Sequence, residues 1–213
     1  ATIPAGLQPR AALALSCIPL LYALEKIGLV KDVDLAVTEA ALTLQSLREG
    51  LARETGQSDN LAKQIAALAH DRIPLIYTGP ELTEPAGVRW RGQFSENGKT
   101  LCYSSVFPEM NHNELVGWSR PTDRYRESLA VILLRDEADH PRVQLRMDLF
   151  AATIREAGAP LQEVSSAGGG RLTRLLSLIQ IGDFVSYYLS VLNGVDPTPV
   201  TAIENLKREL ARR

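Results

Sequence analysis

The sequence predicts an α/β fold, in which a parallel sheet covered by helices on both faces forms a three-layer domain, preceded by a helical N-terminal segment. Apolar residues recur at helical spacing through residues 1–70. From Ile73 onward, four short apolar runs alternate with longer helical stretches. Strands that alternate with helices form parallel sheets that are buried on both faces. The 213 residues are enough for one large or two small domains.

Three helices are expected in the first segment, residues 1–70. Residues 10–28 predict a mostly buried helix that ends at Gly28. Residues 33–51 carry apolar side chains at alternating steps of four and three, which is typical of an amphipathic helix. Asp59 is a candidate N-cap for a shorter third helix. This part of the chain is therefore predicted to be a linker followed by helices.

Residues 71–213 are predicted to form the α/β domain. The expected strands are the runs IPLIYTG, TLCYSSVF, LAVILLR and PLQEVSS. The helical stretches that separate or follow them are residues 86–99, 111–118, 140–158 and 170–193. A last helix is expected to start at Thr198-Pro199, with threonine as N-cap and proline in the first turn, and to run to the C-terminus.

Ligands of open parallel sheets lie at the carboxyl ends of the strands, which makes the loops 108–115 and 165–172 candidate sites. In the second loop, Gly168-Gly169-Gly170 opens a helix, and its amides either bind an anion or only form a turn. Residues 92–100, GQFSENGKT, superficially resemble a phosphate-binding P-loop. They have five residues instead of four before Gly-Lys and end a helix instead of opening one, so this reading is excluded.

Composition and charge exclude several classes of partner. A net charge of −2 makes nucleic acid an unexpected partner. The apolar stretch 11–24 is too short to span a bilayer and lacks a cleavage site, so no membrane association is expected. Cys17 and Cys102 are far apart in apolar runs and predict buried free thiols in a reducing compartment, the cytoplasm. Three histidines without paired spacing predict no metal site.

Two interpretations of His112 are open on pattern alone. Asn111 fits as an N-cap and Glu114 completes a capping box, which makes the histidine incidental. Alternatively, a helix start beyond a strand would hold the imidazole over the sheet, in the neutral form that a general acid or base needs. By themselves, Glu96 and Lys207 are typical of solvated surface charges.

Four segments in order carry more specific motifs. They are Pro9–Leu13, then Phe94–Lys99 (FSENGK), then Pro108-Glu109 with His112-Asn113, and finally Gly194–Pro199 followed by Ile203–Lys207 and Leu210. Together they resemble the bifunctional phosphoglucose/phosphomannose isomerases, a branch of the sugar isomerase (SIS) superfamily, in which the second motif is F-x-E-N-x-K. Glu96 and His112 lie 16 positions apart (112 − 96), as the catalytic glutamate and histidine do in that family.

The resemblance implies that 71–213 is the family's second SIS-type subdomain. It also implies an isomerase that interconverts glucose 6-phosphate, mannose 6-phosphate or both with fructose 6-phosphate through an enediol(ate), without metal or organic cofactor. Glu96 corresponds to the base that removes the carbon-bound proton. His112 and Lys207 correspond to the groups that open the sugar ring, and Arg10 to the arginine that stabilises negative charge on the intermediate.

Substrate and subunit expectations follow from the same resemblance. The substrate is a phosphorylated hexose, and the family forms homodimers whose sites include the neighbouring subunit's histidine. Thr198 corresponds to the threonine linked to acceptance of both C2 epimers. Two extra residues between Thr-Pro and the lysine make that alignment ambiguous, and Thr201 competes with it.

One family feature has no counterpart in these residues. The family's first SIS subdomain holds the phosphate with an S-x-S-G-N-T loop, and residues 165–168 are no substitute. The chain opens on Ala1 and a linker-like stretch, so we expect the natural protein to continue upstream with that subdomain. Because remote phosphate binding supports catalysis, the isolated segment is predicted to be nearly inactive.

Two other functions compete with the isomerase. One is a non-catalytic sugar-phosphate-binding SIS module, as found in some regulators; retention of Glu96, His112 and Lys207 together argues against it, because binding alone needs no base. The other is a helical interaction module on residues 33–70, which only apolar stripes favour.

Overall fold

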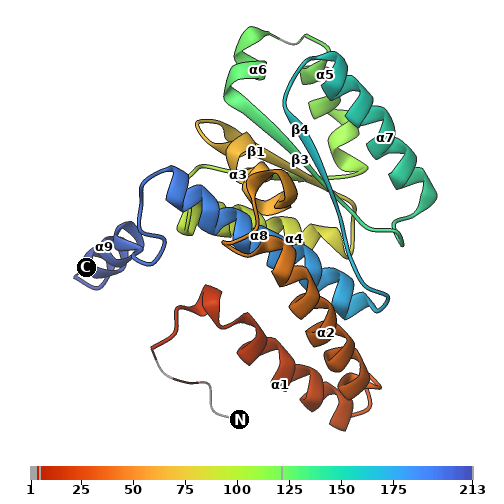
Figure 1. The fold of residues 1–213 in the computed structure, drawn as a ribbon, viewed down its shortest axis with the longest axis vertical. Helices are drawn as coiled ribbons and strands as arrows, with labels where there is room; N and C mark the ends of the chain where they lie inside the picture. Colours follow the sequence, from red (N-terminus) through yellow and green to blue (C-terminus); the bar gives the residue numbers. More distant parts are fainter. Residues whose placement is uncertain (1–3, 5, 121, 213) are drawn as a thin grey trace.

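The computed structural model describes residues 4, 6–120 and 122–212, and its centre is a four-stranded parallel sheet (Figure 1). The strand order is β2-β1-β3-β4. The strands are β1 (Ile73–Thr78), β2 (Tyr103–Val106), β3 (Leu129–Arg135) and β4 (Leu161–Ser165). Each lies within one of the four predicted apolar runs or overlaps it. The predicted α/β class with a parallel sheet is therefore confirmed.

The helices connect and cover these strands. They are α1 (Leu13–Lys26), α2 (Val33–Leu51), α3 (Leu61–Ala69), α4 (Thr83–Glu96), α5 (Glu114–Trp118), α6 (Asp123–Ser128), α7 (Pro141–Glu156), α8 (Arg171–Leu192) and α9 (Thr201–Leu210). In the described residues they are accompanied by the 3₁₀ turns η1 (Pro9–Ala11), η2 (Gln57–Asp59) and η3 (Glu109–His112). The sequence did not predict α6, which lies between two predicted elements.

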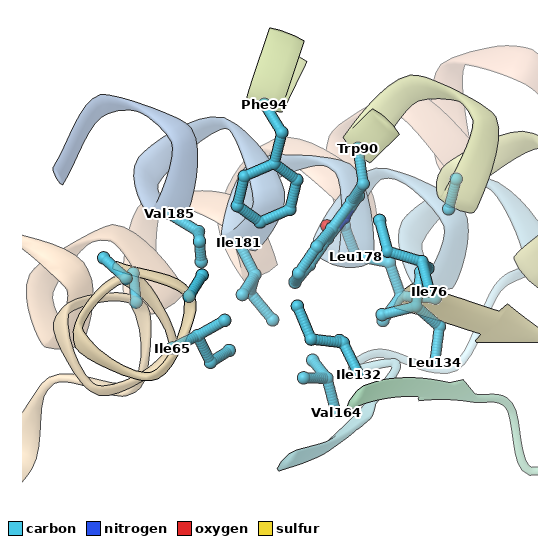
Figure 2. Close-up of a cluster of buried hydrophobic side chains, with 14 of the residues drawn as sticks. Ile65, Ile76, Trp90, Phe94, Ile132, Leu134, Val164, Leu178, Ile181 and Val185 are labelled. Atoms are coloured by element: carbon cyan, nitrogen blue, oxygen red, sulfur yellow. The ribbon is translucent and has the colours of Figure 1, made fainter. Parts of the chain in front are cut away.

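Strand β3 shows why the sheet is buried on both faces. Its residues alternate between the two sides, as the pleat of a strand requires. Ile132 and Leu134 join a core with side chains from α3, α4 and α8 (Figure 2), whereas Val131 and Leu133 join a second core with α5 and α7. The apolar run LAVILLR is thus continuous because both faces of the strand are covered.

Helices α4 and α8 cross closely because α8 has a glycine at the crossing. A Cβ on Gly182 would lie 2.2 Å from Nε1 of Trp90, so any larger residue would displace the indole. That nitrogen donates to the Leu178 carbonyl at 2.7 Å, and Trp90 is fully buried. The crossing fixes α4, and with it the position at which α4 ends.

The prediction of a mostly buried helix over residues 10–28 is wrong in one respect. The helix forms as α1, but none of its residues is buried, because it packs on α2 and not on the sheet. Cys17 is accordingly half-buried, whereas Cys102 is buried as predicted. The apolar content of this segment indicated a core helix, but it lies on the outside of the molecule (Figure 1).

Two predicted helix caps are each displaced. Asp59 lies in η2, and it is Asn60 that caps α3, by accepting from the Lys63 backbone N–H at 3.0 Å. Asn111 likewise lies in a 3₁₀ turn, and Asn113 caps α5. The predicted capping box is therefore wrong: Glu114 is the first residue of α5 and accepts from the hydroxyl of Ser105 instead.

The last helix also starts later than predicted. Helix α9 begins at Thr201, and Thr198 is not its cap. The Thr198 backbone N–H donates to the carboxylate of Asp196 at 2.8 Å, which holds the Asp-Pro-Thr-Pro segment in a turn outside the helix. The predicted helix over residues 86–99 is likewise shifted, and ends at Glu96.

Within the described part of the chain, α8 is the one helix long and apolar enough to cross a membrane. Half of its most apolar stretch is buried, against α2, α3 and α4. The division of the chain at residue 70 stays a prediction. Residues on both sides of it share one core, which includes Ile65 of α3 and Ile76 of β1.

Candidate active site at the end of α4

Glu96 is the last residue of α4, and the direction of that helix decides where the carboxylate lies. Because α4 connects the parallel strands β1 and β2, it runs back from the carboxyl edge of the sheet to the amino edge. Glu96 is therefore at the amino edge. The rule for parallel sheets pointed to the loops 108–115 and 165–172, which lie at the other edge, so it does not lead to Glu96.

Arg10 meets Glu96 from a segment 86 residues away in sequence. Its Nη1 lies 3.3 Å from Oε2 of Glu96, and their side chains are 11% and 37% exposed. A cation held beside a carboxylate can stabilise negative charge on anything that binds next to both. The two residues that the family resemblance selected for base and anion stabilisation are thus neighbours.

The guanidinium of Arg10 is held from several sides. Its Nε donates to Oδ1 of Asn97 at 2.8 Å, and Nη2 donates to the carbonyls of Pro197 and Thr198 at 2.8 and 2.7 Å. The backbone carbonyl of Arg10 accepts from Nη2 of Arg89 at 2.8 Å. These hydrogen bonds fix both the position and the orientation of the guanidinium group.

A cavity of about 470 Å³ opens beside Glu96. One wall is formed by Ser95, Glu96 and Lys99, and the other by residues 199–203 at the start of α9. This volume is within the range of small-molecule sites. A second cavity of about 310 Å³ lies against Arg10 and Asn97.

The two threonines that compete for the family position lie in different places. Thr198 lines the cavity against Arg10, and Thr201 lines the cavity that contains Glu96. Lys207 is exposed on α9, six residues and so about 9 Å along the helix from Thr201. The structure therefore brings Arg10, Glu96 and both threonines to one region, with Lys207 on the adjoining helix.

His112 is not part of this region in the same chain. It ends η3, beyond β2, whereas Glu96 precedes β2, so the length of that strand, about 13 Å, separates them. Buried Met110 and Trp118 anchor the segment and leave His112 exposed. Helix α5, which follows His112, and α9 lie on opposite sides of the molecule (Figure 1).

The glycine loop before α8, residues 168–170, binds a carboxylate of the protein itself. The backbone N–H groups of Gly169 and Gly170 donate to Oε1 of Glu39 at 2.9 and 2.8 Å. These bonds, that from Gly170 first, lower the pKa of Glu39 below its ordinary value. Of the two interpretations of this loop, anion binding describes it, but the anion is a side chain of α2.

The described residues contain no group of three or more His, Cys, Asp or Glu side chains that could hold a metal ion. One acidic pair, Asp136 and Asp139, is buried after the end of β3 and has other partners. Asp136 accepts from Ser166 and Arg174, and its own N–H donates to Asp139. Burial raises the pKa of Asp139.

The sequence model of the family described as "Bacterial phospho-glucose isomerase C-terminal SIS domain" matches residues 58–210, which is most of the chain. The chain belongs to this family.

Relatives of this SIS domain carry a consistent name. A protein of Caldicellulosiruptor bescii named bifunctional phosphoglucose/phosphomannose isomerase is 42% identical over 99% of this chain. One of Aquifex aeolicus with the same name is 35% identical over 99%. The chain spans 62% and 61% of their respective lengths, so these relatives are longer proteins.

Solved structures agree with the SIS fold. A glucose-6-phosphate isomerase like protein from Thermus thermophilus superposes with a TM-score of 0.67 at 25% identity, over 84% of this chain and 58% of that one. A second protein from the same organism, TT0462, superposes with a TM-score of 0.68 at 17% identity, over 99% of this chain and 56% of that one, and so shows the fold alone.

Two residues of this SIS domain at the site have no role in the sequence interpretation. Asn97 holds Arg10, and Lys99 donates to carbonyls on both walls of the cavity beside Glu96. Both belong to the FSENGK motif that carried the resemblance. The available signal was a motif in which asparagine and lysine follow the glutamate closely. Their contacts could not be predicted from it, because they depend on where the fold places residues 10 and 197–199.

Proposed function

We propose that the protein to which this SIS domain belongs interconverts fructose 6-phosphate with glucose 6-phosphate, mannose 6-phosphate or both. The observation that carries the proposal is the Arg10–Glu96 pair at 3.3 Å beside a cavity of about 470 Å³. A base with a fixed cation next to it is what an enediolate intermediate requires. The names of the longer relatives support the substrate class.

Glu96 acts as the base that moves a proton between C1 and C2 of the open-chain sugar. As the proton leaves carbon, negative charge develops on the oxygens of the enediolate, and Arg10 stabilises it. Neither step requires a metal or an organic cofactor. Base assistance of this kind accelerates a reaction by on the order of 10²–10⁴-fold.

Ring opening needs groups that exchange protons with oxygen. Lys207 on α9 serves this purpose from the same chain, and His112 serves it from a second subunit. The position of His112 supports this arrangement, because within one chain β2 separates it from Glu96. We infer a homodimer in which each site combines Glu96 of one subunit with the histidine of the other, in the cytoplasm.

The direct test replaces Glu96 in the protein expressed from its complete reading frame. Glu96→Gln removes the base and keeps the shape, so turnover of fructose 6-phosphate to either aldose should fall by at least about 10²-fold. Glu156→Gln is the matched control, because Glu156 is the exposed last residue of α7 as Glu96 is the last residue of α4. Undiminished turnover in the Glu96 variant would remove this residue from the mechanism and point to Glu109 or Glu114.

The alternative function, a non-catalytic sugar-phosphate-binding SIS module, predicts a different result. Binding needs no base, so the unsubstituted protein would bind fructose 6-phosphate without forming either aldose. The same assay with the unsubstituted protein therefore separates the two functions.

A further inference from the structure

The turn after Glu96 has a lysine where glycine is the usual residue. Lys99 has φ of 54°, in the left-handed region in which an L side chain is crowded by its own backbone. The sequence contains a glycine, but one position earlier. Gly98 is required there for space, because a Cβ would lie 2.9 Å from the Phe94 carbonyl oxygen. A non-glycine residue in this conformation is a reason to ask what its side chain contacts.

The ammonium group of Lys99 donates to backbone carbonyls from two parts of the chain. It donates to the carbonyl of Glu96, in the last turn of α4, and to that of Pro199 at 2.7 Å. A longer bond of 3.5 Å reaches Pro197. Arg10 donates to Pro197 and Thr198, so two cations that flank Glu96 hold three successive carbonyls.

The segment 197–199 depends on these side chains for its position. Pro197 and Pro199 have no N–H group, and the N–H of Thr198 is bonded to Asp196. Every residue of α9 beyond the segment is exposed, and the helix stands apart from the sheet (Figure 1). Since no residue of α9 is buried, the segment that leads into it determines where the helix lies.

This position defines the cavity beside Glu96. Lys99 belongs to the wall that contains Glu96, and Pro199 belongs to the opposite wall with the start of α9. The bond from Nζ of Lys99 to the Pro199 carbonyl therefore joins the two walls directly. If the bond is lost, the distance between the walls is no longer fixed.

We propose that Lys99 is a positioning residue, which holds residues 197–199 against the end of α4 and so sets the distance between Glu96 and the groups that α9 carries. The expected effect of Lys99 on catalysis rests on the function proposed above. Lys99 acts through backbone carbonyls and not on the substrate. Its loss should therefore reduce turnover and leave substrate binding nearly unchanged.

The test compares Lys99→Met with Lys63→Met in the complete protein. Lys63 is a matched control, because its ammonium group also donates to two backbone carbonyls, of Arg53 and Thr55, each at 2.7 Å, and lines neither cavity. For Lys99→Met we expect kcat to fall about ten- to a hundredfold, the effect of a small misplacement of catalytic groups, with little change in KM. Lys63→Met should change neither constant.

Hydrogen exchange provides a readout that needs no activity. The amide groups of residues 200–206 should exchange faster in Lys99→Met than in the unsubstituted protein, and should be unchanged in Lys63→Met. Lys99→Arg, which keeps the charge and several donors, should restore part of both kcat and protection. Lys99→Gly relieves the left-handed strain, so it should lower kcat without lowering the melting temperature.

The outcomes separate the two proposals. An unsubstituted protein without isomerase activity would contradict the proposed function, and the exchange measurement would still decide whether Lys99 holds the segment. Unchanged kcat and unchanged exchange in Lys99→Met would overturn the positioning role. A rise in KM alone would overturn it too, because it would make Lys99 a substrate ligand.

Discussion

Arg10 illustrates why the residue type matters at this site. One guanidinium donates to Asn97, Glu96 and two backbone carbonyls, through three different nitrogens. Lysine has a single nitrogen on a flexible chain and cannot span these partners. An arginine in the linker segment could be predicted from the family motif, but its partners could not, because they are 86 to 188 residues away.

The two thiols should differ in reactivity. Burial raises the pKa of Cys102 to about 12, so near neutral pH almost none of it is the nucleophilic thiolate. Cys17 is partly exposed on α1. Alkylation of the native protein followed by peptide mass spectrometry should therefore label Cys17 and spare Cys102.

Unfolded protein is the control for this labelling, and in it both cysteines should be labelled. Equal labelling of the two in the native state would contradict the buried position of Cys102.

At the scale of elements, Glu39 joins α2 to the start of α8. Its carboxylate accepts from two amides at the positive end of the α8 dipole, and so supplies the charge that this helix end favours. The sequence predicted the helix and the glycines but not the partner, since 130 residues separate Glu39 from Gly169. A Cβ on Gly170 would lie 2.6 Å from Oε2 of Glu39, which explains the glycine there.

The Glu39 contact should make stability depend on pH. Its pKa is lower in the folded protein, chiefly through the Gly170 N–H group, so the ionised form favours folding. The stabilisation is present above the unfolded pKa, about 4.3, and is lost as the pH falls through the folded value. Glu39→Gln should therefore be less stable than the unsubstituted protein in urea unfolding at pH 7, and this difference should shrink toward pH 3.

Glu49→Gln is the matched control for this measurement. Glu49 is exposed on the same helix. Its substitution should cause a small difference without the same pH dependence. A Glu39→Gln difference that stays constant between pH 7 and pH 3 would show that the carboxylate charge is not what holds α2 to α8.

Helices α1 and α9 show that the apolar pattern of a helix does not predict whether the helix is buried. Helix α1 is apolar around most of its surface, and the pattern therefore placed it in the core, whereas α9 is apolar on one side. Helicity follows from local spacing, but burial depends on what packs against the helix. No residue of either helix is buried within the described chain.

At the scale of the whole molecule, the site proposed here needs two subunits. A mixture of Glu96→Gln and His112→Ala subunits tests this in the complete protein. If each site takes its histidine from the partner, half of the dimers in an equal mixture are mixed and each has one intact site. Activity should then return to about one quarter of the unsubstituted level, by random pairing in a twofold dimer.

Each variant measured alone is the control for this mixture, and both should be nearly inactive. If the mixture is as inactive as its components although the subunits exchange, the histidine acts within its own chain. The arrangement across two subunits would then be wrong.

The sequence by itself determined the α/β class, the four strands and the residues of the FSENGK motif. These features depend on local periodicity and on short motifs, and both can be read from consecutive residues. The sequence also located α2, which covers the predicted apolar repeat from Val33 to Leu51.

Only the tertiary structure decided which of these residues meet. The end of α4 lies at the amino edge of the sheet because parallel strands force the connecting helix to run back. Arg10, Glu96 and residues 197–199 converge there from three distant segments. His112 is separated from them because it follows β2 instead of preceding it. Contacts of this kind depend on chain direction and packing, which local sequence does not encode.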